Sequence, residues 1–435
     1  MEKIMALAKR RGFIFPGSEI YGGLAGTWDY GPLGVELKNN IKQEFWRKMV
    51  RERDDVVGID AAILMNPRVW EASGHAEAFS DPLVECKICH ARLRPDHSEE
   101  IAAHAKEHGG QPDWTEPRQF NLLVEARLGA VEEEKTKVYL RGEITQGAHV
   151  NFKNVLDSTR VKIPFGIAQI GKAFRNEITP GNFTFRSREF EQMELQFYVR
   201  PDDAENWFAS LQEQRMGWYK ELGMRSLRLR FREHASDERA HYARAAADIE
   251  YESPFGWKEM EGIHNRGDWD LSRHKKFSGA DVSYFDEARG ASFIPWVIET
   301  SGGVDRAALF FLIDAYHEDG ERVVLKLHPR LAPVKVAVFP LVANKPALVE
   351  KAREIYRSLR TPNSELRTPV VFDDRGNIGK RYYSQDEIGT PWCVTIDYQT
   401  LELDNDTVTV RERDTMAQER IRVSELRVFF EEKLK

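Results

Sequence analysis

The stretch that decides the fold reads Phe174-Arg175-Asn176-Glu177, then Pro180-Gly181-Asn182, then Phe185-Arg186-Ser187-Arg188-Glu189-Phe190-Glu191-Gln192-Met193-Glu194. Two segments joined by a proline–glycine–asparagine turn predict a pair of antiparallel strands. Such a pair would gather two arginines, an aromatic ring and two glutamates around one concave surface. Arginine is a bidentate phosphate ligand, and an aromatic ring can stack on a purine. The stretch therefore predicts a nucleotide site, with a charged surface hairpin as the alternative.

The preceding run, Gly166 to Ala173, matches the spacing of a phosphate-binding loop as far as Lys172. The position that needs a hydroxyl group for magnesium holds Ala173, and no clear helix start follows. This run is therefore not interpreted as a phosphate-binding loop.

A second segment with suitable chemistry lies downstream. The run Phe293-Ile-Pro-Trp-Val-Ile-Glu299-Thr-Ser301-Gly302-Gly303-Val304-Asp305-Arg306 predicts a strand, a glycine turn, and then an apolar helix through Phe310 and Phe311. Arg306 would lie in the first turn of that helix. A turn with one salt-bridged arginine is the alternative interpretation.

The N-terminal part begins with an amphipathic pattern. Leu33, Leu37, Ile41, Phe45 and Met49 recur every four residues and predict a helix of about 20 residues from Pro32. A β-rich run from Val56 to Leu64 and then Pro67 follow. From about 136 to 328, short strand-like runs such as Leu227 to Phe231 predict an antiparallel sheet with few long helices.

Residues 81–120 differ in character, and they are interpreted as an insertion. Cys86-x2-Cys89 followed by His104-x3-His108 has a spacing compatible with zinc, and His90 and His97 are rival ligands. Two reduced thiols and histidines on one helix face are the favoured interpretation, so no metal ligand is assigned.

The C-terminal part alternates between strand and helix patterns. Val334 to Leu341, Val370 to Phe372, Trp392 to Ile396 and Thr407 to Val410 predict strands, Ala347 to Leu359 predicts a helix, and a helix closes the chain. This pattern predicts a separate α/β domain.

Three of these features, in this order, resemble the three motifs of class II aminoacyl-tRNA synthetases: the helix leading to Pro67, Phe174 to Glu177, and Gly303 to Arg306. Longer strings are similar to the homodimeric glycine-specific family: Trp70 to His75, Phe152 to Asp157, Phe183 to Glu194, and Trp257 to Ile263. The resemblance runs from about Phe13 to the C-terminus and is interrupted only near 98–112. Signature sequences of the other synthetase class are absent.

The resemblance implies an α+β fold. An antiparallel-sheet catalytic domain would span 1–80 and 121–330, with the insertion at 81–120 and an α/β anticodon-binding domain at 331–435. It also implies ATP-dependent attachment of glycine to tRNA(Gly) through glycyl-adenylate, releasing AMP and pyrophosphate. ATP and Mg²⁺ are the expected cofactors, and a cytoplasmic homodimer without membrane contact is the expected form.

The family's roles carry over to matching positions. Arg175 would contact the α-phosphate and Glu177 the adenine amino group, Phe190 would stack on adenine, and Arg186 and Arg306 would hold the outer phosphates. Arg175 and Arg306 are the implied catalytic residues, and Glu259 resembles a nucleotide or magnesium ligand. The implied ATP site comprises Arg175, Asn176, Glu177, Phe185, Arg186, Ser187, Arg188, Glu189, Phe190, Glu259, Met260, Gly303, Val304, Asp305 and Arg306.

The family's amino acid pocket also carries over. A substrate without a side chain offers only an ammonium, a carboxylate and two hydrogens, so carboxylates and tight walls would select it. The implied glycine site comprises Arg94, Glu143, Phe190, Glu191, Gln192, Met193, Glu194, Glu299, Thr300, Ser301, Gly302 and Gly303. The chain departs from the family pattern at Gly142, Ile144 and Thr300, which puts the stiffness of the backbone near the pocket in question.

Two other functions are compatible with the class II motifs. One is a catalytically inactive RNA-binding or regulatory protein, and the other is a synthetase for threonine, proline or histidine. The intact arginines and glutamates argue against the first, and the glycine-type strings argue against the second.

Composition restricts the remaining functions. The 435 residues carry a net charge of −7, which argues against non-specific coating of nucleic acid. Mean hydropathy is −0.54, and no apolar run approaches the ~20 residues of a membrane span. The three cysteines exclude a disulfide framework and favour a reducing compartment. Lys380, Arg381, Arg411 and Arg413 are candidate anticodon contacts by charge alone.

Overall fold

A seven-stranded sheet organises the main body of the computed structural model, which describes residues 1–95, 98–110, 112–130, 136–235, 237–240, 242–360, 369–402 and 405–434. All neighbouring strands are antiparallel except the parallel edge pair β10–β3. The strand order is β12 (Leu229–Glu233), β13 (Ala245–Ser253), β14 (Gly256–Gly267), β17 (Trp296–Gly303), β11 (Glu189–Val199), β10 (Phe165–Phe174) and β3 (Val56–Ile59).

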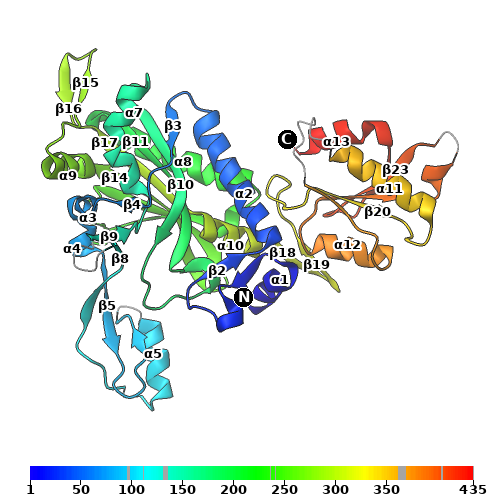
Figure 1. The fold of residues 1–435 in the computed structure, drawn as a ribbon, viewed down its shortest axis with the longest axis horizontal. Coiled ribbons are helices and arrows are strands. Elements are labelled where there is room, and N and C mark those ends of the chain that lie inside the picture. The colour runs from blue at the N-terminus through cyan, green and yellow to red at the C-terminus, as the bar shows by residue number, and fades with distance from the viewer. Residues whose placement is uncertain are drawn as a thin grey trace.

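Three helices pack on one face of this sheet: α2 (Pro32–Trp46), α8 (Ala204–Glu221) and α10 (Val304–Ala315) (Figure 1). A π-helical turn, Arg47–Arg51, extends α2, so the predicted helix of about 20 residues from Pro32 is confirmed. Its stripe of Leu37, Ile41 and Phe45 is at most 1% exposed within the largest core cluster. The stripe is therefore buried within one subunit.

Shorter elements cover the opposite face. Phe152, Phe165 and Tyr198 form part of a second core cluster there. The covering elements are α3 (Pro67–Ser73), α4 (His75–Ala78), α6 (Thr145–Val150), α7 (Phe152–Ser158) and α9 (Trp269–Ser278), with a small sheet of β4 (Leu64–Met65), β9 (Thr136–Leu140) and β8 (Val124–Leu128). Peripheral elements are α1 (Glu2–Arg11), β1 (Ile14–Pro16), β2 (Trp28–Tyr30), β15 (Tyr284–Asp286) and β16 (Ala291–Phe293).

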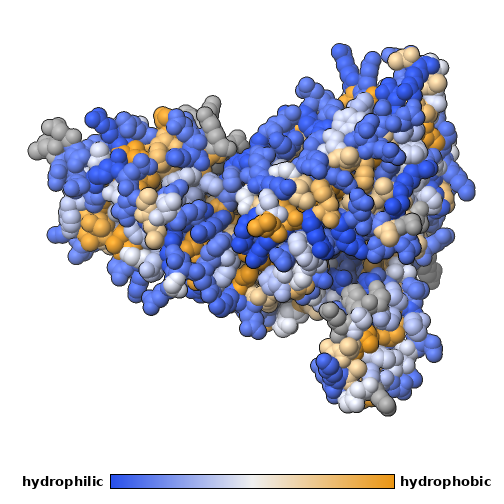
Figure 2. Space-filling model, turned by 180° about the vertical axis from the view of Figure 1, so that it is seen from behind, coloured by the Kyte–Doolittle hydropathy of each residue, from blue (hydrophilic) through white to orange (hydrophobic). Residues whose placement is uncertain are grey.

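The inserted segment forms a lobe that projects from the main body (Figures 1 and 2). It consists of β5 (Ser80–Glu85), β6 (Arg92–Leu93), α5 (Ser98–Glu107) and β7 (Arg118–Asn121). The strands β6, β5 and β7 pair in that order. His97, one of the rival zinc ligands, lies outside the described residues.

The C-terminal part forms its own sheet and core. After the hairpin β18 (Tyr316–Asp319) and β19 (Arg322–Leu325), a five-stranded sheet has the order β21 (Val370–Phe372), β20 (Val336–Pro340), β22 (Trp392–Ile396), β23 (Thr407–Glu412), β24 (Gln418–Arg422). The helices are α11 (Pro346–Leu359), α12 (Ile378–Asp386) and α13 (Leu426–Lys433), packed around a separate apolar cluster. A buried ion pair, Arg322 Nε to Asp386 at 2.7 Å, connects the hairpin to α12.

Two features of the main body differ from what the sequence predicted. The glycine turn predicted between the strand and the helix is wrong, because β17 continues through Gly303 and α10 begins directly at Val304. Helix α8, with 18 residues, was not expected. Among the described residues, no helix combines the length and apolar character needed to cross a membrane.

Three of the four candidate anticodon contacts are buried. Arg381 is 1% exposed and donates hydrogen bonds to the backbone carbonyls of Pro340 and Gly376, among others. Arg411 pairs with Asp386, and Arg413 pairs with Asp414. These three arginines hold the C-terminal domain together, and only Lys380 of the four is exposed.

Candidate active site

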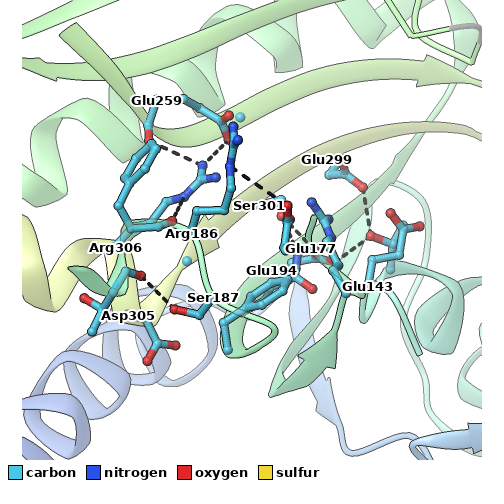
Figure 3. A pocket seen from close by; sticks show the side chains of 18 of the residues that line it. Glu143, Glu177, Arg186, Ser187, Glu194, Glu259, Glu299, Ser301, Asp305 and Arg306 are labelled. Atoms are coloured by element: carbon cyan, nitrogen blue, oxygen red, sulfur yellow. Dashed lines mark hydrogen bonds and ion pairs between the residues drawn. The ribbon is translucent and has the colours of Figure 1, made fainter. Parts of the chain in front are cut away.

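A pocket opens on the face of the central sheet opposite α2 and α8, where β11, β14 and β17 lie side by side (Figure 3). One end carries Glu143, Glu194 and Glu299, and the other carries arginines together with the carboxylates of Glu259 and Asp305. Its lining comprises Glu143, Thr145, Arg175, Glu177, Thr184, Phe185, Arg186, Ser187, Phe190, Gln192, Glu194, Tyr242, Glu259, Gly262, His264, Glu299, Ser301, Gly303, Asp305 and Arg306.

Strand register brings the carboxylate end together. Glu194 of β11 lies opposite Ser301 of β17, and Gln196 lies opposite Glu299. On the other side of β17, His264 of β14 lies opposite Glu299. Because side chains opposite one another in a sheet project from the same face, these groups converge on the pocket.

Glu194 is buried and held only by neutral groups in the described part of the chain. Its carboxylate accepts hydrogen bonds from Ser301 Oγ at 2.6 Å, Thr145 Oγ1 at 2.8 Å, and the amides of Gln192 and Gln196 at 2.9 and 3.3 Å. Burial, and then the nearby carboxylates, raise the pKa of Glu194 to about 8. A cation bound beside Glu194 would therefore favour the ionised form of this carboxyl group.

The other two glutamates already have cationic or imidazole partners. Glu299 accepts from Arg266 Nη1 at 3.0 Å and contacts His264 Nδ1 at 2.9 Å. Although burial opposes ionisation, Arg266 and His264 lower the pKa of Glu299 to about 2. Burial also opposes ionisation of Glu143, but His75 Nε2, 3.2 Å away, lowers the pKa of Glu143. Both side chains line the pocket as pre-formed negative charges.

The opposite end carries three arginines. Arg175 follows β10, and its Nε donates to the backbone carbonyl of Gly142 at 3.1 Å. Its guanidinium carbon lies 5.2 Å from the centre of the Phe190 ring. Arg186 Nε lies 4.0 Å from Glu177. The contacts of Arg175 are to a carbonyl and an aromatic ring and leave its charge able to bind an anion, whereas Arg186 is at the outer limit of an ion pair with Glu177.

Arg306 lies in the first turn of α10, as predicted. It is fixed by Glu259 at 3.0 Å, by a bond to the Phe185 carbonyl at 3.3 Å, and by the Phe185 ring, 4.5 Å from the guanidinium carbon. Figure 3 shows Arg306, Arg186 and Glu259 gathered at one end and Glu194, Glu143 and Glu299 at the other.

Residues that were predicted as contiguous runs of the site are divided between the two faces of the sheet. Side chains along a strand point to opposite faces in turn, so Glu191, Met193, Thr300 and Gly302 lie on the helix-covered face. Glu191 pairs with Lys38 and Lys42 of α2. A Cβ added to Gly302 would lie 3.0 Å from Glu261 Oε2, beneath α8. These four residues shape the sheet and do not line the pocket.

Six other predicted residues also lie outside the lining. Arg94 belongs to the inserted lobe and pairs there with Asp81. Met260 and Val304 are in the main core. Asn176, Arg188 and Glu189 have partners elsewhere: the Leu122 carbonyl, the Ala25 carbonyl and Lys172, respectively.

Five lining residues were missed from the sequence: Thr145, Thr184, Tyr242, Gly262 and His264. Gly262 and His264 lie on the pocket face of β14, but strict alternation after Glu259 would have pointed to Glu261 and Ile263. The register between β13 and β14 shifts between Glu259 and Glu261, and the sequence gives no signal of that shift. Tyr242 comes from a loop and is placed by tertiary contacts, including Arg266 3.8 Å above its ring. No local pattern signals such a position.

Comparisons with known proteins follow the same division of the chain. Residues 124–312 match the family described as the tRNA synthetase class II core domain (G, H, P, S and T). Residues 335–433 match the family described as an anticodon binding domain. A glycine–tRNA ligase from Thermobifida fusca is 51% identical and covers 100% of this chain and 98% of its own length. One from Borreliella burgdorferi is 53% identical over 98% of this chain and 96% of its own length.

The chain belongs to the glycine–tRNA ligase family. As a member of this family it is a class II aminoacyl-tRNA synthetase with an α+β fold and attaches glycine to tRNA in an ATP-dependent reaction. The family uses ATP and Mg²⁺ in general. A catalytically inactive role is not supported by these relatives, which are ligases by name.

Proposed function

We propose that the pocket between Glu194 and Arg306 forms glycyl-adenylate and then transfers glycine to tRNA(Gly). The observation that carries this proposal is the division of the pocket into a carboxylate end and an arginine end on one sheet face. Glycine has a cationic amino group and an anionic carboxylate, and ATP is an anion. The two substrates would therefore meet in the middle of the pocket.

Glu194 is the proposed acceptor for the glycine ammonium group. It has no cationic partner among the described residues, whereas Glu143 and Glu299 are paired. The glycine ammonium would supply the positive charge that Glu194 lacks. The ion pair with Glu194 would in turn offset the free energy that the ammonium loses when it leaves water. Tyr242, His264 and Ser301 are proposed to form the walls that exclude larger amino acids.

Arg175 is proposed to stabilise charge during adenylate formation. A glycine carboxylate oxygen attacks the α-phosphorus, a phosphorus–oxygen bond forms, and pyrophosphate leaves with the electrons of the broken bond. Negative charge develops on the phosphate oxygens, and fixed guanidinium groups stabilise it without a general base. Arg186 and Arg306 are proposed to hold the pyrophosphate, Glu177 the adenine amino group, and Phe190 the adenine ring.

Glu259 is the proposed protein ligand for Mg²⁺. Magnesium in such sites commonly takes one or two carboxylates together with substrate phosphates, and Glu259 lies beside Arg306 with a half-exposed carboxylate. When bound, the ion would neutralise phosphate charge. Transfer then follows when a terminal ribose hydroxyl of tRNA attacks the glycyl carbonyl and AMP leaves.

The catalytic domain is proposed to span 1–80 and 121–330, the anticodon-binding domain 331–435, and the enzyme to act in the cytoplasm where its substrates occur. We also propose a homodimer. The apolar stripe of α2 is buried within one subunit, so the proposed interface is placed on exposed apolar residues. Ile20, Tyr21 and Leu24 are 88%, 86% and 60% exposed on one short segment, which is typical of a contact surface.

Glycine-dependent exchange between ATP and pyrophosphate tests the arginine assignment. Arg175→Ala and Arg306→Ala should each lower exchange by about 100-fold or more, the scale of losing one fixed electrostatic donor. Arg289→Ala is the matched control. Arg289 lies in the exposed turn between β15 and β16, away from the pocket, and pairs there with Asp202. Near-normal exchange by a folded Arg306→Ala protein would falsify the assignment.

A further inference from the structure

The inserted lobe has very little apolar core. Within its described residues between Ser80 and Asn121, only Val84 and Cys86 are buried apolar side chains. A segment of about 40 residues seldom holds its shape by burial alone and usually needs a disulfide, a metal or a partner. The ordered placement of α5 against the β5–β6 hairpin therefore needs an additional connection.

Four side chains with soft or imidazole donors meet at this point. Cys86 and Cys89 lie on the turn after β5, and His104 and His108 lie four residues apart at the end of α5. One donor atom of each lies within 4.8 Å of the others. Cys89 Sγ is 3.5 Å from His104 Nε2, close to the separation that two ligands of one tetrahedral zinc ion require.

The surroundings suit thiolate and imidazole ligands. Backbone N–H groups of Ile88 and Cys89 donate hydrogen bonds to the Cys86 sulfur. The other nitrogen of His104, Nδ1, lies 3.6 Å from Glu107, so a carboxylate stands behind the imidazole as it commonly does at metal sites. His90 is turned away and contacts Glu85 at 3.1 Å.

We propose that Cys86, Cys89, His104 and His108 bind one structural zinc ion. Two thiolates and two neutral imidazoles form a four-coordinate donor set that suits Zn²⁺. Binding releases the two thiol protons to solvent, and no oxidant is needed. Because four protein ligands leave no open position, the ion would connect α5 to the hairpin and take no part in adenylate formation. The sequence alone favoured two reduced thiols, and their convergence with two histidines alters that interpretation.

Metal content of the full-length enzyme tests the proposal. The protein, purified without added metal and freed of loosely bound ions, should contain about one zinc per chain by elemental mass spectrometry. Loss of a residue that only supports a metal ligand costs about 10- to 100-fold in metal affinity. Cys89→Ser and His108→Ala each remove a ligand itself, so each should lower zinc affinity by more than that. His90→Asn, which keeps a residue suited to its positive φ of 62°, should retain the zinc.

A second measurement uses only the unmodified protein, so it does not depend on the variants folding. A mercurial reagent that blocks thiols should release zinc in step with modification of Cys86 and Cys89. Co²⁺ exchanged into the site should give the visible bands of a tetrahedral sulfur-ligated ion. Zinc well below one equivalent after growth with zinc, or zinc unchanged in both ligand variants, would overturn the proposal. Neither readout depends on aminoacylation.

Discussion

At the residue scale, the pocket distinguishes one glutamate from two others of the same type. Glu143 and Glu299 have imidazole or guanidinium partners, whereas Glu194 is held by hydroxyls and amides. The family resemblance placed all three in one glycine pocket. It could not predict how they divide, because Arg266 and His75 reach them from other elements of the fold.

Glycine binding should be pH-dependent through Glu194. Its pKa of about 8 leaves it protonated in the empty site at neutral pH, and a bound ammonium favours the ionised form. Affinity should therefore rise with pH between roughly 6 and 8, with close to one proton released per glycine below pH 7. Calorimetric titration in two buffers of different ionisation enthalpy measures that proton. Absence of proton release would exclude Glu194 as the ammonium acceptor.

Glu194→Gln and Glu299→Gln should separate binding from stability. The first removes the proposed ammonium acceptor, so the KM for glycine should rise at least about tenfold while the KM for ATP stays unchanged. The second leaves the buried Arg266 with only Asp270, so the free energy of unfolding should fall by about 2 kcal/mol or more. Exchange kinetics and urea unfolding of both variants check this. If the two substitutions changed the KM for glycine equally, Glu194 would not be distinguished from Glu299 as the ammonium acceptor.

At the element scale, period-two alternation decides which residues of β11 and β17 reach the substrate. The family resemblance indicated contiguous runs such as Phe190 to Glu194, but only every second side chain can face the pocket. Helix α2 was predicted because its apolar residues recur every four positions. Helix α8 was missed because its buried face includes the charged Arg215, which interrupts the apolar stripe.

Arg215 also gives a prediction for the contact between α8 and β14. It pairs with Glu261 at 2.5 and 2.9 Å, both side chains are fully buried, and the Tyr219 hydroxyl donates to the same carboxylate at 2.6 Å. Glu261→Gln should lower the free energy of unfolding by about 3–5 kcal/mol, because a buried guanidinium loses its counter-charge. Urea unfolding measures it. Glu213→Gln, on the exposed side of α8, should change it by less than about 0.5 kcal/mol, and equal losses would refute the explanation.

At the scale of the whole molecule, the order of three motifs and the change of pattern after residue 330 were enough to predict an antiparallel-sheet core and a C-terminal α/β domain. The prediction from charge alone that Arg381, Arg411 and Arg413 contact the anticodon requires exposed side chains, but all three are buried. Their partners, such as Asp386, become neighbours only after folding. The apolar stripe of α2 likewise packs into the core of a single subunit.

The proposed dimer should depend on the exposed segment near Tyr21. Ile20→Asp combined with Tyr21→Asp would place two charges in an apolar contact, so sedimentation at micromolar concentration should shift from about 100 kDa to about 50 kDa. Leu227→Asp is the control, because Leu227 is 94% exposed on a different segment. A fully active unmodified protein that sediments as a monomer would exclude the dimer.

The central claim is that this one pocket activates glycine and rejects other amino acids. The most direct measurement is ATP–pyrophosphate exchange by the unmodified enzyme, assayed with each of the twenty amino acids in turn. Glycine alone should support exchange, and alanine should fail because the pocket walls exclude its methyl group. Exchange with another amino acid at a rate equal to that with glycine, or no exchange with glycine, would contradict the account.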